Sequence, residues 1–253
     1  MAAVEAVLLD QGNTVLEYGL QGRWREFLGA QLRELQPLVA ETCGEIALSP
    51  EASAAALGEV VGGERARGIE HSGHSWHFGE RLRAGLQAVG LEATEAGLAL
   101  LVEAFYAPIR ESTQPYRESR ETLAGLRALG VKLAIITNSP WDAPGRLLRG
   151  DLERWGLEGF FDAFVCSGDL PWRKPNPAFM LAAAQELSAL PDNCLVVGDT
   201  LGTDIAGAQA AGMRSVWVRR QAQAEADPVP APDCALDDLT DLPRVVAEAG
   251  SPG

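Results

Sequence analysis

The stretch VEAVLLDQGNTV, residues Val4–Val15, is a short apolar run that ends in Asp10 and continues directly into a turn containing Gly12. Short runs rich in Val, Ile and Leu that stop at polar residues are typical of buried parallel strands. Further runs of this form follow along the chain, and they are Lys132–Asn138, Phe161–Ser167, Cys194–Asp199, Arg214–Arg220 and Asp233–Leu239.

Helical segments separate several of these apolar runs. Arg120–Gly130 repeats apolar residues at helical spacing and stops at a glycine, and Asp204–Gly212 also stops at one. Pro177–Leu190 follows Asn176, which is a suitable N-cap residue. Alternating strands and helices predict an α/β fold with a doubly wound parallel sheet, whose ligands bind at the carboxyl ends of the strands.

Residues 19–113 interrupt the alternation. They contain Ala- and Leu-rich helical patterns and no clear strand. We therefore expect an all-helical domain of residues 19–113 inserted into a Rossmann-like core of residues 1–18 and 114–253. A hydrophobic fraction of 47% is sufficient for a sizeable buried core.

Charge and composition exclude several classes of protein. A formal net charge of -14 opposes binding to nucleic acid or to an anionic membrane surface. The N-terminal residues have no basic region, and no apolar run approaches the length of a membrane span. The four cysteines contain no C-x-x-C pattern. We expect a reduced, cytoplasmic protein with neither signal peptide nor membrane segment.

Polar side chains at the predicted strand ends form one constellation. They are Asp10, Thr137, Asn138, Lys174, Asp199 and Asp204. A carboxylate can attack phosphorus and form an acyl phosphate, which divides one difficult displacement into two easier ones. Two carboxylates beside a phosphate require a hard cation such as Mg²⁺, and a lysine offsets further charge on the transferred group. Hydroxyl and backbone N–H groups can bind the phosphate oxygens.

The order Asp-x-x-x-Thr, Thr-Asn, Lys-Pro-x-Pro and Gly-Asp-x-x-x-x-Asp resembles the four motifs of the haloacid dehalogenase superfamily. The resemblance covers nearly the whole chain and implies a phosphatase that uses Mg²⁺ to hydrolyse a small phosphorylated metabolite, with residues 19–113 as a helical cap. The roles it implies are nucleophile and metal ligand for Asp10, metal ligand through the backbone carbonyl for Gly12, phosphate binding for Thr137 and Asn138, charge stabilisation for Lys174, metal ligand for Asp199, and ligand or supporting partner for Asp204.

Gly12 departs from the family pattern. Phosphatases of this family usually carry a second aspartate at this position, two residues after the nucleophile, as general acid and base. The absence of this aspartate leaves two hypotheses. The protein is an active hydrolase, or it is a catalytically weak or inactive protein with a binding or regulatory role. Other reactions of the family fit less well. A dehalogenase lacks the Gly-Asp-x-x-x-x-Asp pattern, and a phosphonoacetaldehyde hydrolase needs a lysine that residues 19–113 do not contain.

Several side chains allow two interpretations. His71, His74 and His77 are a metal or substrate site in the cap, or simply a polar surface. Trp141 and Trp172 line the mouth of the site, or pack in the interior. The sequence also leaves a monomer and a homodimer open.

Overall fold

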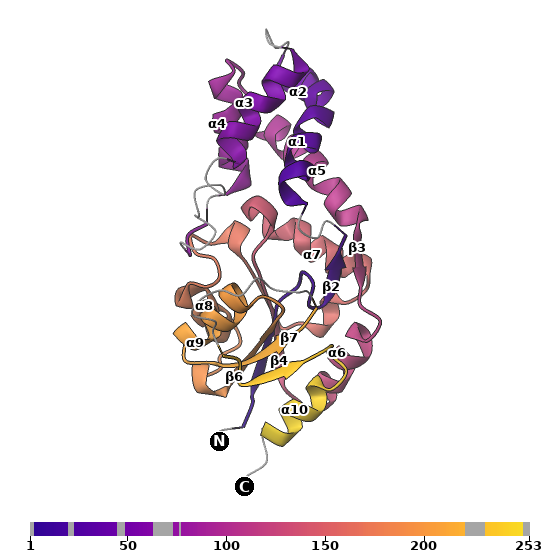
Figure 1. The fold of residues 1–253 in the computed structure, drawn as a ribbon, viewed down its shortest axis with the longest axis vertical. Helices are drawn as coiled ribbons and strands as arrows, with labels where there is room; N and C mark the ends of the chain where they lie inside the picture. Colours follow the sequence, from indigo (N-terminus) through magenta and orange to yellow (C-terminus); the bar gives the residue numbers. More distant parts are fainter. Residues whose placement is uncertain are drawn as a thin grey trace.

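A six-stranded parallel sheet forms the lower part of the molecule (Figure 1). The computed structural model describes residues 3–19, 23–44, 49–62, 73–75, 77–220 and 231–249. The strand order is β5-β4-β1-β6-β7-β8, with bounds Ala163–Cys166, Lys132–Thr137, Ala6–Leu9, Cys194–Gly198, Arg214–Val218 and Cys234–Leu236. The predicted fold class, a parallel α/β sheet, is confirmed.

Strand β1 lies in the interior of the sheet and pairs with β4 on one side and β6 on the other. Leu9 is in register with Ile135 of β4 and with Val197 of β6. The three strands therefore end at nearly the same level, so the polar residues that follow them meet at one edge of the sheet.

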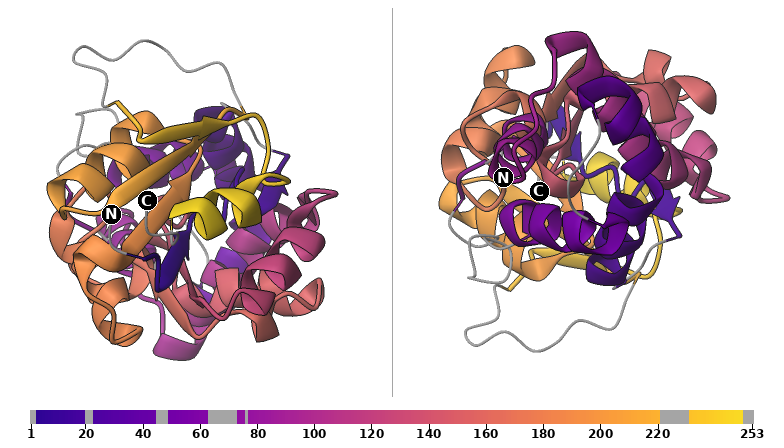
Figure 2. Two further views of the ribbon diagram at one scale, coloured as in Figure 1. Left: turned by 90° about the horizontal axis from the view of Figure 1, so that it is seen from below. Right: turned by 90° about the horizontal axis from the view of Figure 1, so that it is seen from above.

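Both faces of the sheet are covered by helices, as the view from below shows (Figure 2). Alternate residues of a strand point to opposite faces. Val7 and Leu9 pack in a cluster with α6 (Ser119–Ala128) and α10 (Leu242–Ala249). Ala6 and Leu8 pack with α8 (Pro177–Glu186) and α9 (Ala206–Ala210). Short 3-10 and π turns connect the elements, namely η3 (Pro140–Asp142), η4 (Glu158–Phe160), η5 (Ser167–Asp169), η6 (Pro191–Asn193) and η7 (Leu201–Ile205).

A second, helical layer lies at the end of the molecule opposite the two termini (Figure 1). Its helices are α1 (Trp24–Glu34), α2 (Gln36–Cys43), α3 (Pro50–Gly62), α4 (Phe78–Ala88) and α5 (Glu95–Glu111). Their buried apolar residues share one cluster with Trp141 and with α7 (Gly145–Arg154).

Two short strands flank these helices. They are β2 (Leu16–Tyr18) and β3 (Thr113–Pro115), which form an antiparallel pair. Neither was expected from the sequence, because three residues are too few for a periodic pattern. The division of the chain into residues 19–113 and the remainder stays a prediction.

Among the described residues, no helix is both long and apolar enough to cross a membrane. All four cysteines lie in described segments, and each has a free thiol.

Candidate active site

The carboxyl ends of β1, β4 and β6 surround a cavity of about 140 Å³. Asp10 follows β1, Thr137 ends β4, and Asp199 follows β6. Every residue that the sequence predicted for the site lines this cavity. The full lining comprises Asp10, Gly12, Asn13, Tyr18, Thr137, Asn138, Pro140, Lys174, Asp199, Thr200, Thr203 and Asp204.

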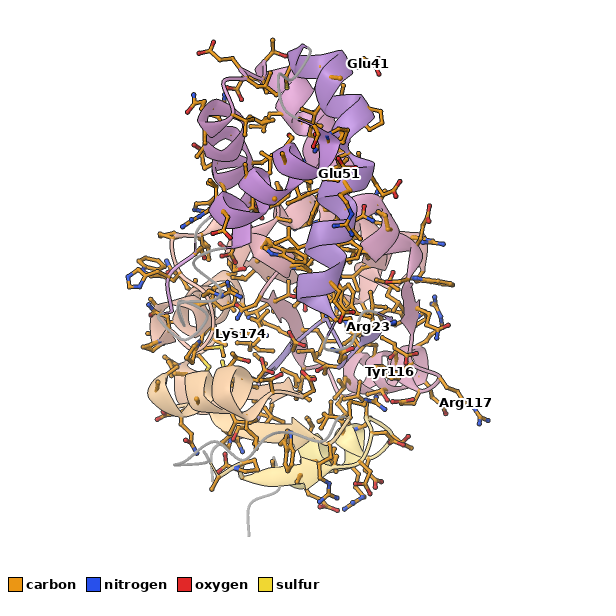
Figure 3. All side chains as sticks on the ribbon, turned by 45° about the horizontal axis from the view of Figure 1, so that its top comes forward. Arg23, Glu41, Glu51, Tyr116, Arg117 and Lys174 are labelled. Carbon is orange, nitrogen blue, oxygen red and sulfur yellow. The ribbon has the colours of Figure 1, made fainter. Side chains whose placement is uncertain are left out.

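Lys174 is the buried cation of the site, and it lies between the helical layer and the sheet (Figure 3). Its Nζ is 2.5 Å from Asp10 Oδ1, 2.6 Å from Asp204 Oδ1 and 3.0 Å from the Ile136 carbonyl. Burial by itself would lower the pKa of Lys174, but the two carboxylates outweigh it and raise the pKa, so the ammonium stays charged.

The side chain of Asn138 holds the loop that carries this lysine. Its Oδ1 accepts from the Lys174 backbone N–H at 2.9 Å, and its Nδ2 donates to the Lys174 carbonyl at 3.0 Å. The Asn138 amide side chain therefore positions Lys174. Binding of phosphate by the backbone N–H of Asn138 stays a prediction.

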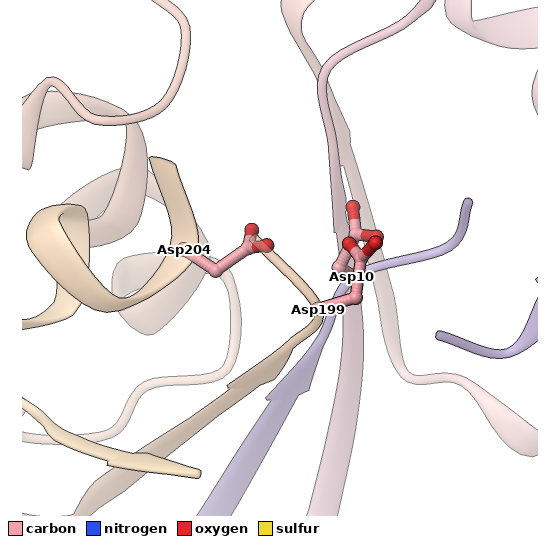
Figure 4. Close-up of side chains that lie close together, drawn as sticks. All are labelled: Asp10, Asp199 and Asp204. Atoms are coloured by element: carbon pink, nitrogen blue, oxygen red, sulfur yellow. The ribbon is translucent and has the colours of Figure 1, made fainter. Parts of the chain in front are cut away.

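Three carboxylates converge at the cavity (Figure 4), and oxygens of Asp10, Asp199 and Asp204 lie within 4.8 Å of one another. Burial, with a smaller contribution from the neighbouring carboxylates, raises the pKa of Asp199 to about 8. Burial also raises the pKa of Asp10 to about 6, although Lys174 acts in the opposite direction. A crowded set of oxygen donors whose charges disfavour one another suits a hard divalent cation.

Both oxygens of Asp204 already have donors, and so do both oxygens of Asp10. Asp204 Oδ1 accepts from Lys174, and its Oδ2 accepts from the Thr200 backbone N–H at 3.0 Å. Asp10 accepts from Thr14 Oγ1 at 3.2 Å in addition to Lys174. The two alternatives for Asp204, metal ligand or supporting partner, both stay predictions.

Tyr18 is a lining residue that the sequence did not single out. A Cβ atom built on Gly12 would lie 2.7 Å from Tyr18 Cε2 and 2.8 Å from Cδ2, closer than any real contact. The tyrosine ring thus occupies the space into which a side chain at position 12 would extend. The sequence carries no signal for this contact, because it depends on β2 folding back over the turn that follows Asp10.

Among the described histidines and tryptophans that the sequence singled out, His74, His77, Trp141 and Trp172 lie outside the cavity lining. His71 is not among the described residues. His74 is exposed and forms an isolated bridge with Trp172, which is 37% exposed. His77 Nδ1 lies 3.1 Å from the Gly168 carbonyl oxygen. Trp141 is only 2% exposed and packs against the rings of Phe27 and Phe105, so the packing interpretation is correct for it.

Comparisons with known proteins agree with this arrangement. A model of the haloacid dehalogenase-like hydrolase family matches residues 4–212. A glyceraldehyde 3-phosphate phosphatase of Methanopyrus kandleri is 32% identical over 184 residues, which are 70% of this chain and 74% of that protein. A phosphoserine phosphatase of Thermus thermophilus is 34% identical over 142 residues, 56% of this chain and 55% of that protein.

The overall fold matches a 2-haloacid dehalogenase from Pseudomonas syringae pv. Tomato DC3000 with a TM-score of 0.64 and 26% identity, over 97% of this chain and 99% of that one. The chain spans about half the length of several other curated relatives. The family model alone covers most of the sequence, and the resemblance seen in the four motifs is confirmed. This chain belongs to the haloacid dehalogenase-like hydrolase family.

Proposed function

We propose that the chain is a magnesium-dependent phosphatase that hydrolyses a small phosphorylated metabolite through an aspartyl-phosphate on Asp10. The observation that carries the proposal is the Lys174 ammonium held between Asp10 and Asp204, beside the carboxylate of Asp199. The relatives named after the dephosphorylation of small phosphate esters support it.

The residues of the site divide the work as follows. A carboxylate oxygen of Asp10 attacks phosphorus, the bond from phosphorus to the leaving oxygen breaks, and the phosphoryl group becomes attached to Asp10. Water then attacks phosphorus, which releases inorganic phosphate and restores the carboxylate. Lys174, the Thr137 hydroxyl and the Asn138 N–H stabilise the charge on the transferred group. Mg²⁺, held by Asp10, Asp199 and the Gly12 carbonyl, would neutralise the phosphoryl oxygens.

Two other functions compete with this proposal. Carbon–halogen cleavage is the reaction named for the Pseudomonas syringae neighbour. Three carboxylates within 4.8 Å of one another favour a site that holds a divalent cation and a phosphate over one for a halogenated acid. The second alternative, a weakly active or inactive binding protein, is favoured by Gly12, since nothing at that position can exchange a proton.

The test is hydrolysis of an aryl phosphate with Mg²⁺ and with excess EDTA. We expect turnover only with the metal, and Asp10→Asn should abolish it, because an amide cannot form a stable acyl phosphate. Asp237→Asn, a matched change at an exposed ion pair, serves as the control and should retain activity. Full activity in EDTA, or in Asp10→Asn, would exclude this mechanism. Magnesium-dependent binding of phosphate without any turnover would support the binding-protein alternative.

A further inference from the structure

Tyr18 fills the space next to Gly12, on the side of the cavity where a side chain at that position would lie. We infer that Tyr18 is a specificity-determining residue. Its ring prevents any proton-donating side chain from occupying this side of the cavity. The site therefore selects phosphate compounds whose leaving group departs as an anion, such as aryl or acyl phosphates. Only the substrate selectivity in this inference rests on the proposed function, whereas the steric contact between Tyr18 and position 12 does not.

Two backbone contacts and one side-chain contact hold Tyr18 in place. The Tyr18 backbone N–H donates to Asn13 Oδ1 at 3.2 Å, and Asn13 itself has a positive φ of 59°. Tyr18 pairs with Thr113 in the β2–β3 ladder. Its hydroxyl accepts from Gln11 Nε2 at 3.2 Å, and the residue is only 4% exposed. Displacing a ring held in this way, to make room for a new side chain at position 12, costs free energy.

The hydroxyl of Tyr18 is poorly placed as a substitute acid. Its partner Gln11 is fully buried and does not line the cavity, and the same Gln11 amide donates to the Leu148 carbonyl at 3.0 Å. The atoms of Tyr18 nearest to Gly12 are the ring carbons Cδ2 and Cε2. A side chain at position 12 would therefore meet ring carbons and not the hydroxyl group.

The chemical consequence concerns the electron pair of the breaking bond. When phosphorus passes to Asp10, this pair stays on the leaving oxygen. A phenolate or carboxylate is stable with it, whereas an alkoxide must gain a proton. General acid help of this kind is worth about a hundred- to ten-thousand-fold in rate. A site without it discriminates against alkyl phosphates.

A double-mutant cycle on thermal stability tests the steric contact without reference to activity. Gly12→Ala should lower the Tm by about 2–10 °C in the wild-type background, because the new Cβ overlaps the ring. In a Tyr18→Val background, which lacks the ring atoms, the same change should have almost no effect. Gly159→Ala is the control, since a Cβ there meets nothing within 4 Å. Equal losses in both backgrounds would overturn the inference.

Kinetics test the selectivity. Wild type and Tyr18→Phe should both prefer 4-nitrophenyl phosphate over glycerol 3-phosphate by about a hundredfold or more in kcat/KM. Gly12→Asp combined with Tyr18→Val should narrow this ratio about tenfold or more, through faster turnover of the alkyl ester. Equal efficiency of the wild type on both substrates, or an unchanged ratio in the double variant, would refute the role of Tyr18. Absence of any phosphatase activity refutes the proposed function, but it does not affect the stability cycle.

Discussion

At the level of the single residue, Lys174 has two roles. Its ammonium group neutralises the charges of Asp10 and Asp204 in the free protein, and it stabilises charge on the transferred group in the proposed reaction. It is almost completely buried, and two carboxylates lie within hydrogen-bond distance of its Nζ. Removal of one partner from a buried ionic cluster is strongly destabilising because it leaves charge without compensation.

We expect Lys174→Met to lower the free energy of unfolding by about 3–5 kcal/mol. Adding Asp204→Asn should recover part of the loss, because it removes one of the uncompensated carboxylates. The chain has only one other lysine, the exposed Lys132, whose Nζ donates to the Leu187 carbonyl. Lys132→Met is therefore the matched control and should cost less than about 1 kcal/mol. Urea denaturation measures all three, and equal effects at the two lysines would contradict the assignment.

The close approach of Asp204 explains why the residue before Asp199 is a glycine, Gly198. A Cβ at position 198 would lie 2.3 Å from Asp204 Cγ. The glycine thus allows the Asp204 carboxylate to pass close to the end of β6 and reach Lys174.

At the level of the elements, a buried carboxylate joins helix α5 of the helical layer to helix α7. Asp151 of α7 accepts from the Tyr106 hydroxyl at 2.6 Å and from Arg110 Nε at 3.3 Å, both residues of α5. Burial raises the pKa of Asp151 to about 6, although both partners act to lower it. Between about pH 4 and pH 6 the folded protein therefore holds a proton that the unfolded chain, with an ordinary pKa of 3.8, has already released.

The contribution of Asp151 to stability should be greatest below about pH 4 and should decline as the pH rises to about 6. The whole effect amounts to at most about 3 kcal/mol. Asp151→Asn should flatten the decline, because asparagine does not titrate and can still accept from Tyr106. Urea denaturation at a series of pH values between these limits measures the slope, with exposed Asp241→Asn as the control. Parallel pH profiles for Asp151→Asn and wild type would show that the carboxylate does not titrate in this range.

On the scale of the whole molecule, the helical layer and the part that contains the sheet share one buried apolar core. One apolar cluster contains residues of α1–α5 together with Trp141, Leu147 and Leu148. At its centre Phe105 contacts the rings of Phe27, Phe78 and Trp141. A common core of this kind favours unfolding of both layers in one transition.

Phe105→Ala should lower the global free energy of unfolding by about 3–5 kcal/mol, because it leaves a cavity where the two layers meet. Hydrogen exchange should show the loss of protection in β1 and in α5 together. Leu100, on the same helix and 55% exposed, supplies the control substitution Leu100→Ala, which should have little effect. Faster exchange confined to α5, with β1 unchanged, would indicate that the layers unfold separately.

Much of this protein could be read from the sequence, because the relevant signals are local. Apolar runs predicted the strands, and glycine and N-cap positions marked helix ends such as Asn176, whose side chain accepts from Ala178 N–H as expected. The polar residues at strand ends were brought into one cavity because parallel strands align their carboxyl ends at one edge. The short strands β2 and β3 escaped prediction, since three residues carry no period.

The chain order alone predicted the parallel sheet, the family and part of the cavity lining, including Asp10, Lys174 and Asp199. The tertiary structure decided how these residues share their contacts: Asn138 holds the Lys174 backbone, Asp204 has both oxygens occupied, and Trp141 packs against the helical layer. It also placed Tyr18 against Gly12. Such contacts depend on the packing of one segment against another, and local periodicity contains no information about which side chain will occupy the space left by a glycine.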